Sequence, residues 1–441
     1  MKRFTFFSRL LNTVLFSITV LFFSSSTAQE QIKKLDNPLS VDYLQNTLLK
    51  TQPRLVLNLQ NEKLLRQKLA SDPVVQNMYK AIQLNAARIY DQPLPERIVT
   101  GKRLLSVSRA FLYRINLLGM VYFVDKNPKA LERINAELNA VCTFSDWNPS
   151  HFLDVAEMAL GVALALDWTT GDLPRSTINL AHTALIEKGL NPSYASTGMG
   201  WIKSNHNWNQ VCHGGMIAAA ISIAEINPEL AAKTISRALD NIPLTLKEYG
   251  PDGVYPEGAT YWSYGTGFSV ITSSMLSSAF GTDFGLADYP GFKESAVFKM
   301  LMESPSGLYY NYGDCGLSRG KNGDIFLAWF AAQTGKKALF EKERFLRPAD
   351  EMGLSRLAGA GLVWLAQYTE KEKKPLPPVW IGDGTTPIII FKNGESDRHK
   401  YYFAAKGGMA GDNHANMDNG SFIFELNGVR WAVDIGSQGY H

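Results

Sequence analysis

The chain has 441 residues, of which 45% are hydrophobic and 11% aromatic, and this composition is ordinary for a globular protein. It carries 44 Lys and Arg against 41 Asp and Glu, and residues 1–28 hold three of the basic residues and none of the acidic ones. Beyond residue 28 the charges therefore balance. A balanced chain has no global field to attract nucleic acid or another polyanion, so an acidic partner must be recognised by a local site.

The N-terminus has the pattern of a secretory signal peptide over residues 1–28. Three basic residues precede an apolar run at 10–23, and Ser26 and Ala28 form a small-x-small pattern before a cut at Gln29. The run of about 14 residues is short for a bilayer span, which needs roughly 20. We therefore expect export to the periplasm or the medium, as in a Gram-negative bacterium, and no membrane span.

Three cysteines in an exported chain of this length do not form a disulfide framework. They are Cys142, Cys212 and Cys315, an odd number, and none lies in a metal-type CxxC pair. We expect three buried free thiols, with one disulfide and a leftover thiol as the alternative.

Helical periodicity extends through residues 40–368, which form the first predicted domain. Apolar residues recur at i, i+3 and i+4 in several segments, which are 62–90, 104–124, 128–142, 152–168, 176–190, 214–226, 229–249 and 324–335. Pro128 and Pro228 each follow an Asn, a pattern typical of helix starts. Successive helical hairpins over this length favour a helical toroid or solenoid rather than one compact bundle.

The pattern changes at residues 369–380, which are charged and rich in proline and are predicted to be a linker. Residues 381–441 contain short β-branched and aromatic runs separated by glycine-containing turns, which predict strands. Asn427-Gly428 between two such runs is a hairpin signal. This β domain is only about 60 residues long, so we expect the chain to be a piece of a longer protein.

Three segments concentrate polar, aromatic and glycine residues and are predicted to be loops that carry function: 203–215, 251–267 and 406–421. Segments 144–154 and 310–320 show the same features more weakly. Their residue types fit proton abstraction next to a carboxylate, as in β-elimination from a uronic acid. Amide donors would stabilise the enolate-like state, and Tyr or His would remove the C5 proton and protonate the leaving O4.

The residues available for this chemistry are Asn207 and Asn209 as amide donors, Tyr261 as a proton shuttle and His414 as a base. At these positions the sequence resembles heparinase II/III-type polysaccharide lyases. The motifs that carry the resemblance are NWN at 207–209, DGVYPEGATYWSY at 252–264 and GDNHANMDNGSFIFELNGVRWAVDIG at 411–436, with DWNPSHFLDVAEMA at 146–159. The resemblance covers about residues 50–440.

The resemblance implies an α+β multidomain protein, with an incomplete (α/α) toroid followed by an antiparallel β-sandwich and an active cleft between them. It implies that an Asn in the toroid neutralises the substrate carboxylate, which matches Asn207, with Asn209 as a competitor. It implies Tyr261 as the acid, or as both acid and base, and His414 as the base or a helper. The substrate would be an acidic polysaccharide or oligosaccharide, such as a glycosaminoglycan or alginate.

No cofactor is required by this chemistry, but some relatives bind zinc in the β domain. The matching positions here are Asn416 and Asp434, and an amide oxygen is a poor zinc ligand compared with imidazole. A structural zinc or calcium ion is therefore left open. The sequence does not indicate an oligomeric state.

Other side chains in the five segments are candidates for substrate binding. They are His206, Trp208, Tyr264, Trp147, His151, Glu257 and Arg319. Each has an ordinary alternative: Tyr264 could stack on a sugar or substitute for Tyr261, Glu257 could be structural, and Asp314 with Arg319 could form a surface ion pair or contact an anion.

Two other functions fit parts of the sequence. A glycoside hydrolase on a helical toroid would use paired carboxylates, either Asp252 with Glu257 or Asp154 with Glu157. It would leave His414 without a role. A non-catalytic polysaccharide-binding protein would be expected to have lost the Tyr or the His, and both are present.

Overall fold

The computed structural model describes residues 32–195, 197–318, 320–393, 399–411 and 413–437. The segment predicted to be a signal peptide lies outside these residues. Lys34–His441 forms one compact unit, and the description below concerns this unit. None of the helices in the described ranges combines the length and the apolar run that a bilayer crossing requires.

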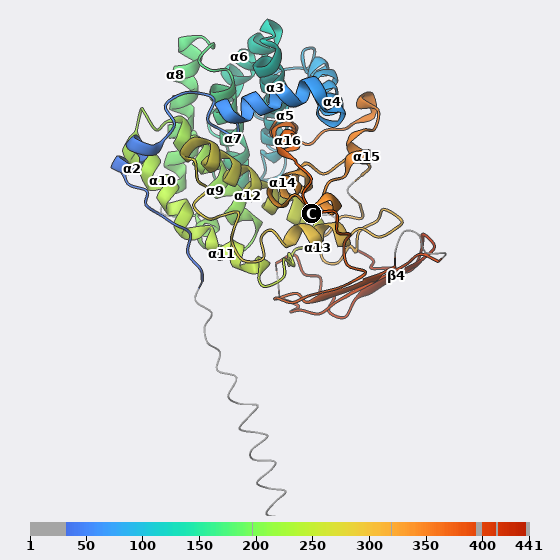
Figure 1. Cartoon of the computed structure of the whole chain (residues 1–441). Coiled ribbons are helices and arrows are strands. Elements are labelled where there is room, and N and C mark those ends of the chain that lie inside the picture. The colour runs from blue at the N-terminus through green and yellow to red at the C-terminus, as the bar shows by residue number, and fades with distance from the viewer. Residues whose placement is uncertain (1–31, 196, 319, 394–398, 412, 438–441) are drawn as a thin grey trace, which may run out of the picture. The chain divides into compact units, whose positions relative to one another are not determined.

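Helices fill the chain from Val41 to Gln367 (Figure 1). The longer ones are α3 (Leu59–Ser71), α4 (Pro73–Ile89), α5 (Leu105–Asp125), α6 (Pro128–Cys142), α7 (Phe152–Trp168), α8 (Arg175–Ala184), α9 (Asn207–Ser222), α10 (Pro228–Asn241), α12 (Gly258–Phe280), α14 (Ile325–Thr334) and α16 (Ala358–Gln367). The shorter ones are α2 (Val41–Thr47), α11 (Pro243–Leu246), α13 (Ser295–Leu301) and α15 (Lys342–Phe345). A π-helical turn, Leu185–Leu190, continues α8.

The most buried helices form a closed ring. Neighbours pack in the order α5, α7, α9, α12, α14 and α16, and α16 returns to pack against α5. All residues of α7 are buried, as expected for a helix that is apolar on every side. Helices α4, α6, α8 and α10 pack against this ring from outside. This arrangement agrees with the predicted helical toroid.

Arg54 and Asp167 link the helices at one end of the ring. Arg54 Nη2 donates to the Ile221 carbonyl near the end of α9, at 2.9 Å. Asp167, near the end of α7, accepts from the backbone N–H groups of Arg54 and Leu55. A cation near the carboxyl ends of helices is stabilised by the helix dipoles. The carboxyl ends of α7 and α9 therefore meet here, and their amino ends meet at the opposite end, which we call the mouth.

The C-terminal part forms a five-stranded antiparallel sheet in the order β1-β2-β3-β4-β5. Its strands are β1 (Val379–Gly382), β2 (Ile388–Lys392), β3 (Tyr401–Lys406), β4 (Phe422–Leu426) and β5 (Val429–Ala432). A second sheet, as a β-sandwich would require, is not found in the described ranges. One face of the sheet is buried and the other exposes apolar side chains, which are Val379, Ile381, Tyr401, Phe422 and Trp431.

The buried face of the sheet packs against the helical part on the side of α13 (Figure 1). Tyr402 on β3 donates its hydroxyl to the carbonyl of Leu301, the last residue of α13, at 2.8 Å. Glu425 on β4 is 0% exposed and accepts hydrogen bonds from Ser304 and Ser306, which follow α13. Side-chain bonds therefore fix the sheet to the helical body.

Local sequence signals account for several element boundaries. Asn127 and Asn227 cap α6 and α10 with their side chains, and each is followed by Pro at the first helical position, as predicted. Asn427 and Gly428 both have positive φ, 52° and 80°, and join β4 to β5 in the predicted hairpin. All three cysteines are free and buried, as expected.

Two predictions about where helices begin and end need correction. The periodic segment 62–90 is two helices, because Asp72 caps a new helix at Pro73 and a proline cannot continue the preceding one. Segments 203–215 and 251–267 are only partly loops, since α9 begins at Asn207 and α12 at Gly258. Burial of these first turns outweighs the low helix propensity of Asn and Gly.

Candidate functional site

The first turns of α9 and α12 meet at the mouth through Asn207 and Glu257. Asn207 begins α9 and donates its side-chain Nδ2 to Glu257 Oε2 at 2.6 Å, and its backbone N–H points to Oε1 at 3.3 Å. Glu257 precedes α12 and is 4% exposed. Burial raises the pKa of Glu257, and the Asn207 amide opposes this rise. One of the two Nδ2 hydrogens of Asn207 is used by Glu257, and a ligand would have to reach the second one at a residue that is 1% exposed.

His414 lies against Tyr261, one turn into α12. The two rings are stacked, with centroids 3.8 Å apart and planes 22° from parallel. His414 Nδ1 is 2.7 Å from Asp314 Oδ2, and its Nε2 is 3.8 Å from Glu257 Oε2. Asp314 holds Nδ1, so Nε2 is the ring nitrogen on the side of Glu257. The imidazole and the phenol are thus side by side, and both residues are half-buried.

The backbone of the 406–421 segment presents His414 in an uncommon conformation. His414 has φ +60°, and its carbonyl accepts from the Asp314 N–H at 3.1 Å. Gly313 makes this contact possible, because a Cβ there would lie 2.5 Å from the His414 oxygen. Asp418 binds Lys406 Nζ at 2.7 Å and the Gly313 N–H at 2.6 Å. Non-glycine residues with positive φ cluster at functional sites.

His206 lies immediately before α9 and within electrostatic range of His414. Burial lowers the pKa of His206, and the neighbouring His414 lowers it further. Asn413 hydrogen-bonds Glu257 from the 406–421 segment. His206, Asn207, Glu257 and His414 therefore form one cluster with Tyr261.

A second contact at the mouth links α7 to α9. The rings of His151 and Trp208 meet edge to face, with centroids 4.9 Å apart. His151 Nδ1 is 2.7 Å from Asp154, which is 0% exposed and also accepts from the Leu104 N–H at 2.6 Å. Both rings are half-buried, so each presents an edge at the mouth.

Tyr264 does not substitute for Tyr261 but belongs to a buried charge cluster. Its hydroxyl donates to Glu157 Oε1 at 3.0 Å, and Glu157 is 0% exposed. Arg109 Nε and Arg356 Nε lie 2.9 Å and 2.6 Å from the same carboxylate. Burial, and then the charge of Glu157, hold the pKa of Tyr264 well above its usual value. A phenol in these surroundings keeps its proton.

Two side chains that were predicted to contact substrate, Trp147 and Asn209, are fully buried in this structure. Trp147 is 0% exposed and donates its indole N–H to the Val141 carbonyl at 3.0 Å, so it packs in the core. Asn209 is 0% exposed and donates Nδ2 to the carbonyls of Ile202 and Asn241. Successive residues of a helix or loop project in different directions, so these two side chains point inward while their neighbours point toward the mouth.

Arg319 lies outside the described residues. Asn416 is exposed, and Asp434 accepts from the Gly436 N–H at 2.9 Å. Across the described ranges, no group of three or more His, Cys, Asp or Glu side chains is arranged to hold a metal ion. A metal at Asn416 and Asp434 stays a prediction.

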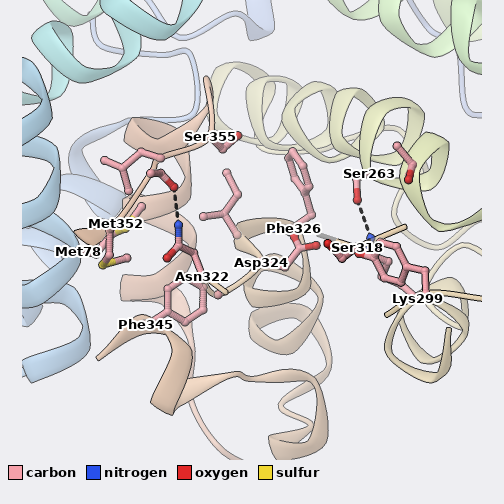
Figure 2. A pocket seen from close by; sticks show the side chains of 16 residues that line it. Met78, Ser263, Lys299, Ser318, Asn322, Asp324, Phe326, Phe345, Met352 and Ser355 are labelled. Atoms are coloured by element: carbon pink, nitrogen blue, oxygen red, sulfur yellow. Dashed lines mark hydrogen bonds between the residues drawn. The ribbon is translucent and has the colours of Figure 1, made fainter. Parts of the chain in front are cut away.

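A cavity of about 350 Å³ lies beside α12 but away from this cluster (Figure 2). Its walls are mostly apolar and include Phe326, Phe345 and Met352. Lys299 Nζ at its edge donates to Ser263 Oγ at 2.8 Å, as Figure 2 shows. None of the predicted site residues in the described ranges lines this cavity.

The paired carboxylates of the hydrolase alternative are arranged unfavourably. Asp154 and Glu157 are both 0% exposed and bonded to His151 and to two arginines, respectively. Asp252 accepts from the Asp383 N–H at 3.0 Å, whereas Glu257 faces Asn207 and His414.

Sequence patterns missed Arg109 and Arg356. Both lie in ordinary helical text, and no motif marks them. Asp314 had a weak signal from its glycine-rich segment, but its partner, His414, is 100 residues away in sequence.

Comparisons with known proteins give partial overlaps with solved structures. Two structures of a heparinase III, one with methylated lysines, overlap with TM-scores of 0.47 and 0.45 at 15% and 12% identity and cover 78% and 94% of this chain. A chondroitin AC lyase of Streptomyces coelicolor in complex with chondroitin sulphate overlaps with a TM-score of 0.48 at 14% identity and covers 84%. The chain spans 53% to 61% of the length of these structures.

Overlaps at these scores do not by themselves assign an activity to this chain. No family model matches the chain, and no curated protein matches its sequence.

Proposed function

We propose that the protein is a polysaccharide lyase that cleaves a uronic-acid-containing polymer by β-elimination. The observation that carries the proposal is the stacked pair of His414 and Tyr261 beside the Asn207 amide. Two proton-transfer groups and an anion-binding amide from three distant segments converge at one mouth. The motif resemblance to heparinase II/III-type lyases supports the same reaction.

The proposed reaction uses side chains of this chain at each step. The Asn207 amide, with its second Nδ2 hydrogen, binds the uronate carboxylate and stabilises the charge that develops on it. His414 Nε2 removes the C5 proton, and the C5–H electron pair forms the C4=C5 double bond. The C4–O4 bond breaks, and the Tyr261 hydroxyl gives its proton to the leaving O4. His414 and Tyr261 then exchange a proton through solvent to restore the starting state.

Glu257 and Asp314 act as positioning residues in this proposal. Asp314 fixes the imidazole so that Nε2 faces the substrate. Glu257 holds the Asn207 amide, and burial favours its neutral form because its pKa is raised. A neutral Glu257 would not repel the substrate carboxylate, whereas an ionised one would.

The stacked geometry also favours one stereochemistry. Adjacent acid and base groups approach the sugar from the same face, which suits elimination of a C5 hydrogen and an O4 that are cis. Glucuronate and mannuronate have H5 and O4 on the same face, whereas iduronate, guluronate and galacturonate have them on opposite faces. We therefore propose polymers of D-glucuronate or D-mannuronate as substrates, and we expect the enzyme to act on them in the periplasm or the medium.

The test is an assay of purified protein on polymers that differ only at C5, such as dermatan against chondroitin, or guluronate against mannuronate blocks. A lyase releases a product with ultraviolet absorbance from its C4=C5 bond, and we expect at least about tenfold higher kcat/KM on the cis polymer. New reducing ends without that absorbance would instead indicate a hydrolase. Binding without any product would indicate a polysaccharide-binding protein.

A further inference from the structure

The charge cluster around Tyr264 contains two arginines but only one carboxylate, that of Glu157. Arg109 and Arg356 each contact Glu157, and their guanidinium carbons lie 4.8 Å and 5.2 Å from the Tyr264 ring centroid. The phenol is thus flanked by two guanidinium groups. Glu157 is 0% exposed, but the side chains of Arg109 and Arg356 remain 40% and 26% exposed.

The cluster carries one net positive charge. Arginine stays protonated in proteins, so two guanidinium groups face a single carboxylate. The nearest other carboxylate on α7, Asp154, is 0% exposed and is bonded to His151 and the Leu104 N–H. One bidentate arginine would satisfy Glu157. The second leaves a cation that is partly open to solvent.

The cluster adjoins the proposed reaction centre. Tyr264 and Tyr261 are three residues apart on α12, so they lie on one face of the helix and about 4.5 Å apart along its axis. Glu157 follows Asp154 by three residues on α7, and Asp154 holds His151, which contacts Trp208. A polymer bound at Tyr261 and Trp208 would place its next sugar near the exposed guanidinium groups.

We propose that Arg109 and Arg356 form an anion-binding subsite for an acidic group on the sugar adjacent to the cleaved uronate. This proposal rests on the proposed lyase function for the position of the reacting sugar. Glu157 holds both guanidinium groups in place and offsets one of their charges. Planar guanidinium groups bind carboxylate and sulfate through paired N–H donors. The ligand is therefore a carboxylate or sulfate of an acidic polysaccharide.

Binding of the preferred uronate polymer to variants in a Tyr261→Phe background tests the subsite without turnover. Arg109→Gln and Arg356→Gln should each raise Kd about tenfold or more, since a charge-assisted hydrogen bond to the ligand is lost. Each should also weaken the dependence of Kd on salt. Glu157→Gln should lower Kd, because it removes the negative charge and leaves both cations.

A purely structural role predicts a different pattern. Arg109→Gln, Arg356→Gln and Glu157→Gln would then lower thermal stability and leave Kd unchanged. That result would contradict the proposed subsite. Arg109→Lys should recover part of the affinity because it keeps the charge. If Arg109→Gln does not fold, the signs of the Glu157→Gln and Arg109→Lys effects decide the question.

Arg114→Gln is the matched control. Arg114 also lies on α5 and pairs with a buried glutamate, Glu137, at 3.0 Å, but its side chain bonds the Pro93 carbonyl outside the ring. Its loss should lower stability and leave Kd unchanged. A fall in affinity equal to that of Arg109→Gln would contradict the proposal.

Two further arms separate the outcomes. Sulfated and unsulfated forms of one polymer identify the ligand: an Arg109→Gln effect on both indicates the carboxylate, and an effect on the sulfated form alone indicates sulfate. Wild-type protein that releases no unsaturated product contradicts the lyase function. The opposite shifts in Kd would still establish the subsite, so the two proposals fail separately.

Discussion

The orientation of His414 depends on residues that are distant in sequence. Asp314 binds its Nδ1, the Asp314 N–H binds its carbonyl, and Gly313 leaves room for that carbonyl. A positive φ at His414 has an energetic cost, which these contacts offset. The imidazole is therefore held in one orientation in the free protein, which suits the proton transfer proposed for it.

Asp314→Asn should lower kcat at least about tenfold and leave KM nearly unchanged, because the imidazole loses its fixed tautomer while the proposed carboxylate clamp at Asn207 is intact. Steady-state kinetics on the preferred polymer measures both constants. Asp240→Asn, which alters a hydrogen bond to Asn37 on the outer side of α10, is the control. Equal kcat values for the wild type and Asp314→Asn would refute the positioning role.

Loss of a proton-transfer group should have a larger effect. His414→Ala and Tyr261→Phe should each reduce kcat about 100-fold or more, since general acid–base groups contribute at least this much. The rate of absorbance increase from unsaturated product measures the change. Variants within a few-fold of the wild type would show that other residues transfer the protons.

The stability of the protein should depend on pH through Glu257. Its pKa is raised in the folded state by burial, so the folded protein binds its proton more tightly than the unfolded chain. The contribution of Glu257 to stability is present below its ordinary value of 4.5 and is lost as the pH rises through the folded-state pKa. In urea unfolding, the free energy of unfolding of Glu257→Gln relative to that of the wild type should increase over that pH range.

Asp418 supplies a contrast of opposite sign. Burial opposes its ionisation, but Lys406 and the Gly313 N–H lower its pKa overall. The stability that Asp418 contributes is present above its ordinary value of 3.8 and is lost as the pH falls through the lower folded-state pKa. If the pH dependences of Glu257→Gln and Asp418→Asn had the same sign, this explanation would be wrong.

At the scale of elements, the mouth depends on close packing of α7 against α9. Gly215 on α9 faces Ala156 on α7, and a Cβ at Gly215 would lie 2.4 Å from the Ala156 carbonyl oxygen. Backbone atoms of both helices fill this contact. The distance between the two helices sets the relative positions of His151, just before α7, and Trp208, in the first turn of α9.

Gly215→Ala should destabilise the protein by about 1–3 kcal/mol, because backbone rather than a flexible side chain would have to move. Gly200→Ala is the matched control, since a Cβ at Gly200 would meet no atom within 4 Å and the φ of this residue is not positive. It should change stability by no more than about 0.5 kcal/mol. Denaturant unfolding of both variants measures the difference, and equal effects would contradict the packing argument.

At the scale of the whole molecule, the sheet brings His414 to the helical ring. The 406–421 segment connects β3 to β4, and residues that follow α13 bind Ser421 at its end and Glu425 on β4. Glu425 and Arg430 form a pair at 2.8 Å in which both side chains are nearly buried, 1% and 7% exposed. The site is complete only when the sheet is attached to the ring.

Glu425→Gln should destabilise the protein by about 3–5 kcal/mol, because it leaves the Arg430 charge buried without its partner. Thermal unfolding measures the change, and activity at low temperature should persist where the protein is folded. Arg347→Gln, which breaks the exposed pair with Glu351, should cost no more than about 0.5 kcal/mol. Similar losses in both variants would mean that burial of the pair is unimportant.

The amino-acid sequence by itself determined the local features of this protein. Caps at Asn127 and Asn227, the hairpin at Asn427-Gly428 and the apolar periodicity of α7 follow from nearest-neighbour rules of hydrogen bonding and spacing. The same local patterns identified Asn207, Tyr261 and His414 as candidates, because their motifs stand out from apolar helical text.

Only the tertiary structure decided which of these side chains meet. Trp147 and Asn209 lie beside predicted site residues in sequence, yet they point into the core, because direction along a helix changes by about 100° per residue and the loop before α7 turns inward. Arg109, Glu157 and Arg356 converge from distant parts of the chain without any shared motif. Such contacts depend on the closure of the ring, a long-range packing result that no local pattern encodes.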